Sequence, residues 1–151
     1  MTLLDFDLRT ETPSRVKTAH PQQISIWGPA GCGKTLVAIN IAFELASLGH
    51  RVALVDAATR RPAIASALGI VDPGAGILAL LRLARQQRLD QEQFQRLSHE
   101  VQFEKSSLKV VTGISQISRW PEFDEAALSG FFEWLGLNFD FVIVDLDSDL
   151  E

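Results

Sequence analysis

The fold of this chain is constrained most by one eight-residue segment, Gly28-Pro29-Ala30-Gly31-Cys32-Gly33-Lys34-Thr35. It matches G-x-x-x-x-G-K-[ST] in full and lies between an apolar run, 24–27, and a helical pattern over 34–48. Glycines in such a turn let several backbone N–H groups point at one phosphate, and the following helix adds its positive end. The segment therefore predicts a phosphate-binding loop. The alternative is a chance glycine turn followed by a surface lysine.

The polar groups of this segment and two distant acids predict a magnesium nucleotide site. Lys34 is expected to reach the β- and γ-phosphates. The Thr35 hydroxyl is expected to bind Mg²⁺, which keeps several waters and takes few protein ligands. Asp56 and Asp145 each follow four apolar residues, which places them at the carboxyl edge of a sheet, where open α/β folds bind ligands. Simple solvation of a strand end is the alternative for each acid.

Strand-like and helix-like segments alternate along the chain. The predicted strands are 24–27, 52–55, 108–112 and 141–144, and the predicted helices are 34–48, 62–68, 77–87, 91–101 and 124–135. This alternation predicts an α/β fold, a parallel sheet with helices on both faces. Residues 1–21 lack sustained periodicity and contain two prolines, so we expect a flexible N-terminal arm before a nucleotide-binding domain over 22–151.

Composition and charge exclude several classes of protein. A chain of 151 residues fits one domain, and no apolar run reaches the ~18 residues that span a bilayer. The single cysteine, Cys32, excludes an internal disulfide and a cysteine-based zinc site, which favours a cytoplasmic location. The net charge of −5 makes nonspecific DNA binding improbable. The segment 120–151 holds nine acids and no Lys or Arg; we expect a solvated face there, with a surface for a basic partner as the alternative.

The chain resembles the MinD/ParA family of P-loop ATPases, including its pilus-assembly and bacterial tyrosine-kinase-like branches. The resemblance covers about residues 22–147. It rests on ISIWGPAGCGKTLVAINIAFELASLGHRVALVD, RRP, GILALL, LKVVTG and FDFVIVD. It implies ATP or ADP with Mg²⁺ as ligands, with Asp145 as the Walker B acid acting through water and Asp56 as the first acid of a D-x-D switch element. The implied cofactor-binding residues are Gly28, Pro29, Ala30, Gly31, Cys32, Gly33, Lys34, Thr35 and Leu36; the metal ligands are Thr35 and Asp145; the catalytic candidates are Asp56 and Lys34.

Two departures from the family pattern bear on hydrolysis. The family's signature lysine, which reaches the nucleotide of an opposite subunit in an ATP-sandwich dimer, would fall at Pro29, and proline has neither charge nor N–H. The second acid of D-x-D would fall at Ala58, which cannot accept a hydrogen bond from the attacking water. In addition, Leu146-Asp147-Ser148 follow the Walker B acid, where the family usually has small or proline residues. Losing one such device commonly costs about 10²-fold in rate.

The sequence therefore predicts a nucleotide binder with weak or absent ATPase activity. By resemblance it positions or regulates another assembly, as a homodimer or with a protein partner, and lies in the cytoplasm or at the membrane periphery through that partner. A noncatalytic scaffold is one alternative. An AAA+ ATPase is another, but that class expects an Asp-Glu pair where Asp145 is followed by Leu146. A tyrosine-kinase-like ATPase is a third; the chain has no tyrosine, which excludes self-phosphorylation of a tyrosine tail.

The resemblance also predicts an open sheet edge. In the family, the strand on the outer side of the phosphate-loop strand comes from sequence after the Walker B strand, and this chain ends six residues after Asp145. We therefore expect an incomplete domain in which residues 24–27 expose backbone hydrogen-bonding groups. The N-terminal arm around residues 3–8 is the alternative cover for this edge.

Overall fold

The computed structural model describes residues 21–147, apart from the side chains of Ile117 and Trp120. Of the predicted N-terminal arm, 1–21, residues 1–20 lie outside the described residues, as do the last four residues, 148–151. The strands are β1 (Gln22–Ile26), β2 (Val52–Asp56), β3 (His99–Phe103), β4 (Ser106–Val111) and β5 (Phe141–Asp145). The helices are α1 (Lys34–Ser47), α2 (Ile64–Ala67), α3 (Gly76–Arg85), α4 (Gln91–Leu97), the 3-10 helix η1 (Ile117–Glu122) and α5 (Glu125–Asn138).

The five strands form one sheet in the order β1-β5-β2-β4-β3. Strands β1, β5, β2 and β4 run parallel, and only β3 is antiparallel to its neighbour. In register, Asp145 at the end of β5 lies between Ile26 of β1 and Asp56 of β2. The predicted α/β fold is confirmed, but the sheet is mostly parallel rather than parallel throughout, because β3 pairs with β4 in the antiparallel direction. Because β1, β5 and β2 are parallel, their carboxyl ends lie side by side, as the sequence predicted for Asp56 and Asp145.

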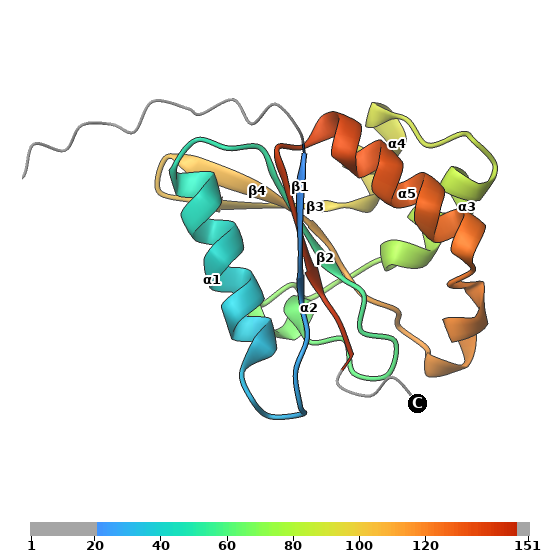
Figure 1. Ribbon diagram of the computed structural model, residues 1–151, viewed down its shortest axis with the longest axis horizontal. Helices are drawn as coiled ribbons and strands as arrows, with labels where there is room; N and C mark the ends of the chain where they lie inside the picture. The colour runs from blue at the N-terminus through green and yellow to red at the C-terminus, as the bar shows by residue number, and fades with distance from the viewer. Residues whose placement is uncertain (1–20, 148–151) are drawn as a thin grey trace, which may run out of the picture.

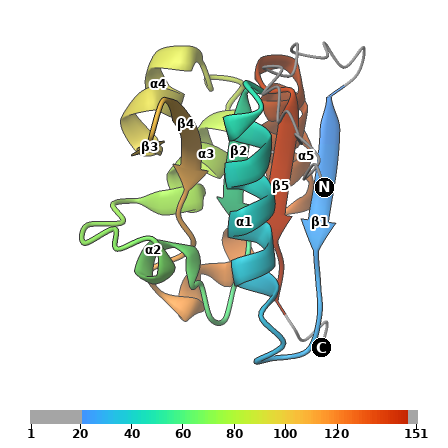
Figure 2. The ribbon, with the colours of Figure 1, turned by 90° about the vertical axis from the view of Figure 1, so that its left-hand side faces the viewer.

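Helices cover both faces of the sheet. Figure 1 shows α1 on one side of the strands and α3, α4 and α5 on the other, and Figure 2 shows α1 lying along the sheet. Two hydrophobic clusters correspond to these layers: one centres on α1 and the other on α3 and α5. Every residue of β2 is buried, because both faces of this central strand are covered. Within residues 21–147, no helix is long and apolar enough to cross a membrane.

One predicted element is wrong in part. The helix expected over 91–101 ends at Leu97, and His99–Phe103 forms β3, a strand that pairs with β4 in a hairpin. The sequence of β3 alternates polar and apolar residues, HEVQF, which is the period of a half-buried strand. The hairpin turn contains no glycine or asparagine; Glu104 adopts a φ of 50° instead. Without that turn signal, the alternation was the only indication of the strand.

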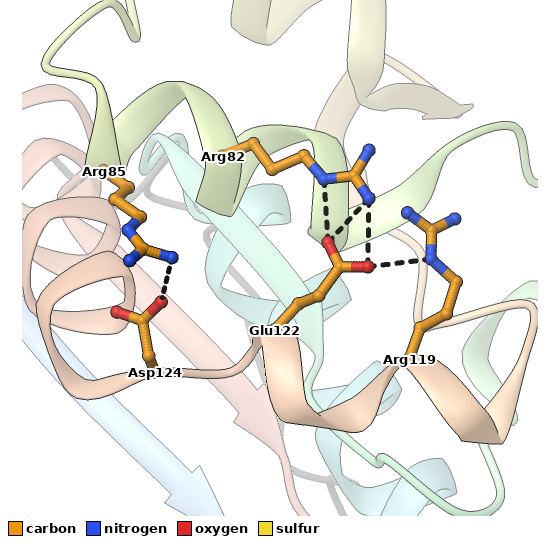
Figure 3. A network of polar contacts seen from close by, with 5 residues as sticks. All are labelled: Arg82, Arg85, Arg119, Glu122 and Asp124. Carbon is orange, nitrogen blue, oxygen red and sulfur yellow. Dashed lines mark hydrogen bonds and ion pairs between the residues drawn. The ribbon is translucent and has the colours of Figure 1, made fainter.

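Two arginines of α3, Arg82 and Arg85, form ion pairs with acids of the segment 120–151. Figure 3 shows Arg82 and Arg119 both bonded to Glu122, and Arg85 paired with Asp124. The Arg82 Nε to Glu122 Oε2 distance is 2.7 Å. Asp124 also caps α5 by accepting the Ala127 N–H at 2.9 Å. Some acids of the acidic C-terminal segment therefore tie η1 and the start of α5 to α3. Such exposed pairs contribute little to stability.

The two edges of the sheet differ in protection. Strand β1 pairs only with β5 among the described residues, so the predicted edge position of the phosphate-loop strand is confirmed. Its sequence, QQISI, has no charge, and Trp27 beyond it is 56% exposed. At the other edge, β3 carries Glu100, which pairs with Lys109 at 2.9 Å. Charged edge strands resist pairing with other chains, whereas β1 lacks this protection.

Candidate functional site

The predicted phosphate-binding loop connects β1 to α1 at the carboxyl edge of the sheet. Gly31 and Gly33 have φ values of 80° and 85°, a left-handed conformation that glycine adopts without strain. Gly28 is in close contact with the loop for a different reason: a Cβ there would lie 2.9 Å from the Cys32 Sγ, so the Cys32 side chain would have to shift. Helix α1 begins at Lys34 with no acidic residue in its first turn, so its positive end is not neutralised locally. The loop residues 29–33 are all exposed.

The Thr35 side chain joins this loop to the Walker B acid. Its hydroxyl donates to Asp145 Oδ2 at 2.6 Å, although the two residues are 110 positions apart. Asp145 is 1% exposed, and burial raises the pKa of its carboxyl group, while the Thr35 hydrogen bond and the Lys34 charge oppose that rise. The structure thus brings together Lys34, Thr35 and Asp145, three residues that the sequence predicted to act together.

These residues fit a Mg²⁺ ion that keeps most of its water. Asp145 Oδ1 is buried and has no hydrogen-bond partner within the described part of the chain, so it can accept from a metal-bound water. No group of three or more His, Cys, Asp or Glu side chains in residues 21–147 could hold a metal ion. One hydroxyl and one carboxylate are typical of Mg²⁺ bound largely through water and phosphate oxygens. The donor set therefore suits magnesium better than a fully protein-bound metal.

Asp56 lies beside Asp145 in the sheet but its side chain is used internally. It is 0% exposed and accepts three backbone N–H groups, from Ala58 at 3.2 Å and from Ala63 and Ile64 at 3.0 Å each. Burial raises the pKa of Asp56 to about 6, while these hydrogen bonds oppose the rise. Its oxygens hold the start of α2 rather than facing open space. This arrangement favours a structural role for Asp56 over the predicted catalytic one.

The other predicted positions divide into loop and helix surfaces. Pro29 and Ala30 lie on the exposed side of the loop, and Leu36 in the first turn of α1 is 61% exposed. Ala58, where the family has its second acid, is 3% exposed. A carboxylate at that position would start from a buried backbone next to Asp56. An aspartate at position 58 would therefore have to place its carboxylate in a buried environment, which a substitution on an exposed surface would not.

Sequence reasoning missed the roles of two residues near the site. Asp147 was noted only as a departure from the family, yet its Oδ2 accepts from the Thr59 hydroxyl and N–H at 2.6 Å each. Gly113, after β4, packs so closely that a Cβ there would lie 2.4 Å from the Pro62 Cβ and 3.0 Å from the Asp56 Cγ. No local pattern reveals these contacts, because each joins segments distant in sequence. An acid two residues after a strand-end acid was the one available signal for Asp147.

The geometry defines a P-loop nucleotide-binding fold, and comparisons with known proteins identify the family. The pattern of the family CbiA, described as "CobQ/CobB/MinD/ParA nucleotide binding domain", matches residues 28–120, more than half of the chain. The chain therefore belongs to this family, and the predicted MinD/ParA resemblance is confirmed. No match was found among curated proteins.

Solved structures of this family share the fold. A ParA family ATPase from Chlorobium tepidum TLS has a TM-score of 0.73 and 16% identity, with 86% of this chain and 53% of that chain covered. The septum site-determining protein MinD from Pyrococcus horikoshii OT3, complexed with Mg-ADP, has a TM-score of 0.65 and 22% identity, covering 86% and 51%. The kinase domain of the Escherichia coli tyrosine kinase ETK has a TM-score of 0.63 and 22% identity, covering 83% and 46%. The chain spans about half the length of these structures.

Proposed function

We propose that this protein binds ATP or ADP with Mg²⁺ through the loop 28–35. The observation that carries the proposal is the contact between the Thr35 hydroxyl and Asp145 Oδ2, which leaves the buried Asp145 Oδ1 without a partner below an exposed loop. Lys34 would bind the β- and γ-phosphates, Thr35 the metal, and Asp145 a metal-bound water. Bound Mg²⁺ would supply positive charge to the phosphate oxygens. ATP and Mg²⁺ are ligands of the cell interior, and the proposal places the protein in the cytoplasm.

The proposal includes weak or absent hydrolysis. Hydrolysis needs a group that orients the attacking water and positive charge that stabilises the transition state. Pro29 supplies no charge, Ala58 supplies no acceptor, and the Asp56 carboxylate is occupied by three N–H groups. We propose accordingly that the bound nucleotide stabilises a conformation that positions or regulates another assembly. The binding of that partner would be the output of the protein, in place of turnover.

Thermal unfolding with and without nucleotide tests this function. At a concentration of Mg-ADP about 100 times its Kd, binding adds about 2.7 kcal/mol to the free energy of unfolding, enough to raise the Tm by several degrees. Lys34→Ala should remove this increase. Lys105→Ala is the matched control, because Lys105 is an exposed lysine in the hairpin turn between β3 and β4. No increase for the wild-type protein, with ATP or ADP, would favour a noncatalytic scaffold.

A further inference from the structure

The loop between β2 and α2 has its backbone donors turned inward. Residues 57–64 contain seven backbone N–H groups, since Pro62 has none, and six of them have protein acceptors. The acceptors are the Asp145 carbonyl for Ala57 at 2.9 Å, Asp56 Oδ1 for Ala58 at 3.2 Å, Asp147 Oδ2 for Thr59 at 2.6 Å and Arg60 at 3.0 Å, and Asp56 Oδ2 for Ala63 and Ile64 at 3.0 Å each. A loop with six of its seven N–H groups bonded to acceptors within residues 21–147 is typical of a fixed conformation.

Two carboxylates, Asp56 and Asp147, accept five of these N–H groups. Asp56, at the end of β2, holds the two ends of the loop. Asp147, two residues after the end of β5, holds its middle through the N–H groups of Thr59 and Arg60 and through the Thr59 hydroxyl. Hydrogen bonds to an ionised carboxylate are shorter and about twice as strong as neutral ones. Asp147 therefore links the neighbouring ends of β2 and β5 across 88 residues of sequence.

The rest of the surroundings also restrain the loop. Pro62 fixes one φ angle and packs against Gly113 at the end of β4, where no side chain would fit. Ala58, near the start of the loop, is 3% exposed and its side chain carries no polar group that could bind a phosphate or a water. A loop that followed the nucleotide would have to release several of these hydrogen bonds and turn its N–H groups outward.

We propose that Asp147 is a positioning residue that, with Asp56, locks residues 57–64 in one conformation whether the bound nucleotide is ATP or ADP. The chain thereby binds nucleotide without a nucleotide-dependent movement of this loop. The second part rests on the proposed function, because it requires that nucleotide binds. The first part, the lock itself, concerns the protein without ligand.

Amide hydrogen exchange of the full chain without nucleotide tests the lock. In Asp147→Ala, exchange at Thr59 and Arg60 should be at least ~10-fold faster than in wild type, because local opening no longer breaks three hydrogen bonds. Asp147→Asn, which keeps an acceptor oxygen but no charge, should give an intermediate rate and serves if the alanine variant does not fold. The matched control is Asp140→Ala, since Asp140 accepts the Arg51 N–H at 2.8 Å at the opposite end of the sheet. Wild-type rates at Thr59 and Arg60 in both Asp147 variants would overturn the lock.

The same measurement with Mg-ADP and with a nonhydrolysable ATP analogue tests the consequence. Wild-type exchange at Thr59 and Arg60 should agree between the two nucleotides within about 2-fold, whereas Asp147→Ala should exchange at different rates in the two complexes. A wild-type difference above ~10-fold would show that the loop follows the nucleotide and would overturn the proposal. If neither nucleotide binds, the proposed function and this second part fail together, while the exchange rates without ligand still decide the lock.

Discussion

The two loops at the carboxyl edge of the sheet are built in opposite ways. The loop after β1 is exposed, takes left-handed φ angles at Gly31 and Gly33, and donates no backbone hydrogen bond to a carboxylate among the described residues. The loop after β2 is held by two carboxylates that accept five of its N–H groups. The supporting strands differ too: β1 has one neighbouring strand among the described residues, whereas β2 is central and fully buried. Most backbone N–H groups of the first loop are available to bind an anion, whereas most of those of the second loop are used in hydrogen bonds within the protein.

This difference separates binding from hydrolysis. Phosphate binding depends on loop N–H groups, a lysine and a metal site, and the residues proposed for these roles are the loop 28–33, Lys34, Thr35 and Asp145. Hydrolysis in a D-x-D family depends on side chains from the β2 side, and here that side has an alanine and a structural aspartate. The loop after β1 can thus retain phosphate-binding groups while the loop after β2 has only a structural role.

The largest expected effect on stability comes from removing the carboxylate that holds the two ends of the loop after β2. Asp56→Ala leaves two buried N–H groups and one partly buried N–H group without their acceptor, at roughly 1 kcal/mol or more for each. We expect the free energy of unfolding to fall by about 3 kcal/mol in denaturant titrations. Glu100→Ala, which removes a carboxylate from the exposed ion pair with Lys109, is the control with a small effect. A loss below about 1 kcal/mol for Asp56→Ala would contradict the structural role of this residue.

Asp145→Asn, at the end of β5, tests the proposed magnesium site beside the loop after β1. Asparagine keeps the size of the side chain but removes the charge that would hold the metal's water shell. Groups that act through a metal's outer shell commonly change metal affinity by 10- to 100-fold, and we expect a loss of about that size in Mg²⁺ affinity, measured by magnesium titration of the ADP complex. An unchanged magnesium affinity would mean that the metal lies elsewhere.

Restoring the missing acid should have a smaller effect. Ala58→Asp adds a carboxylate to a buried position beside Asp56, while Pro29 still supplies no charge. We expect phosphate release to stay within ~10-fold of the slow wild-type rate, because one restored device does not replace two. Wild-type turnover at the rate of an ordinary ATPase would show instead that the β2 loop is competent as it stands.

The smallest effect concerns the strand that carries the open loop. The Gln22 N–H donates to the Asp140 carbonyl, and the Ile26 carbonyl accepts from the Leu146 N–H, so the backbone groups of these residues point toward β5. The backbone N–H and C=O groups of the alternating residues Gln23 and Ser25 therefore point away from β5, toward the open edge. We expect weak self-association through this edge, seen by light scattering at rising concentration.

Ser25→Lys should reduce that association, because a lysine on an edge strand opposes pairing with another chain. Gln102→Lys on β3 is the matched control at the edge that already carries charge. A wild-type protein that stays monomeric, with slow amide exchange at Gln23 and Ser25, would mean that another segment of the chain covers β1.

The loop after β1 could be recognised in the sequence, whereas the contacts that hold the loop after β2 could not, for a physical reason. The phosphate loop is a local device: its glycines, Lys34 and Thr35 are consecutive, and the apolar runs before Asp56 and Asp145 mark buried parallel strands. The contacts of Asp147 with Thr59 and of Gly113 with Pro62 join distant segments and leave no local pattern. Strand β3 was missed because its turn uses Glu104 at a positive φ in place of the usual glycine or asparagine.

The most direct test of nucleotide binding on the β1 side is a calorimetric titration of Mg-ADP into the wild-type chain and into Lys34→Ala. The account predicts saturable binding at one site per chain for the wild type, weakened when magnesium is removed by a chelator, and no measurable binding for Lys34→Ala. Heats equal to dilution for the wild type, or the same Kd in both proteins, would contradict it.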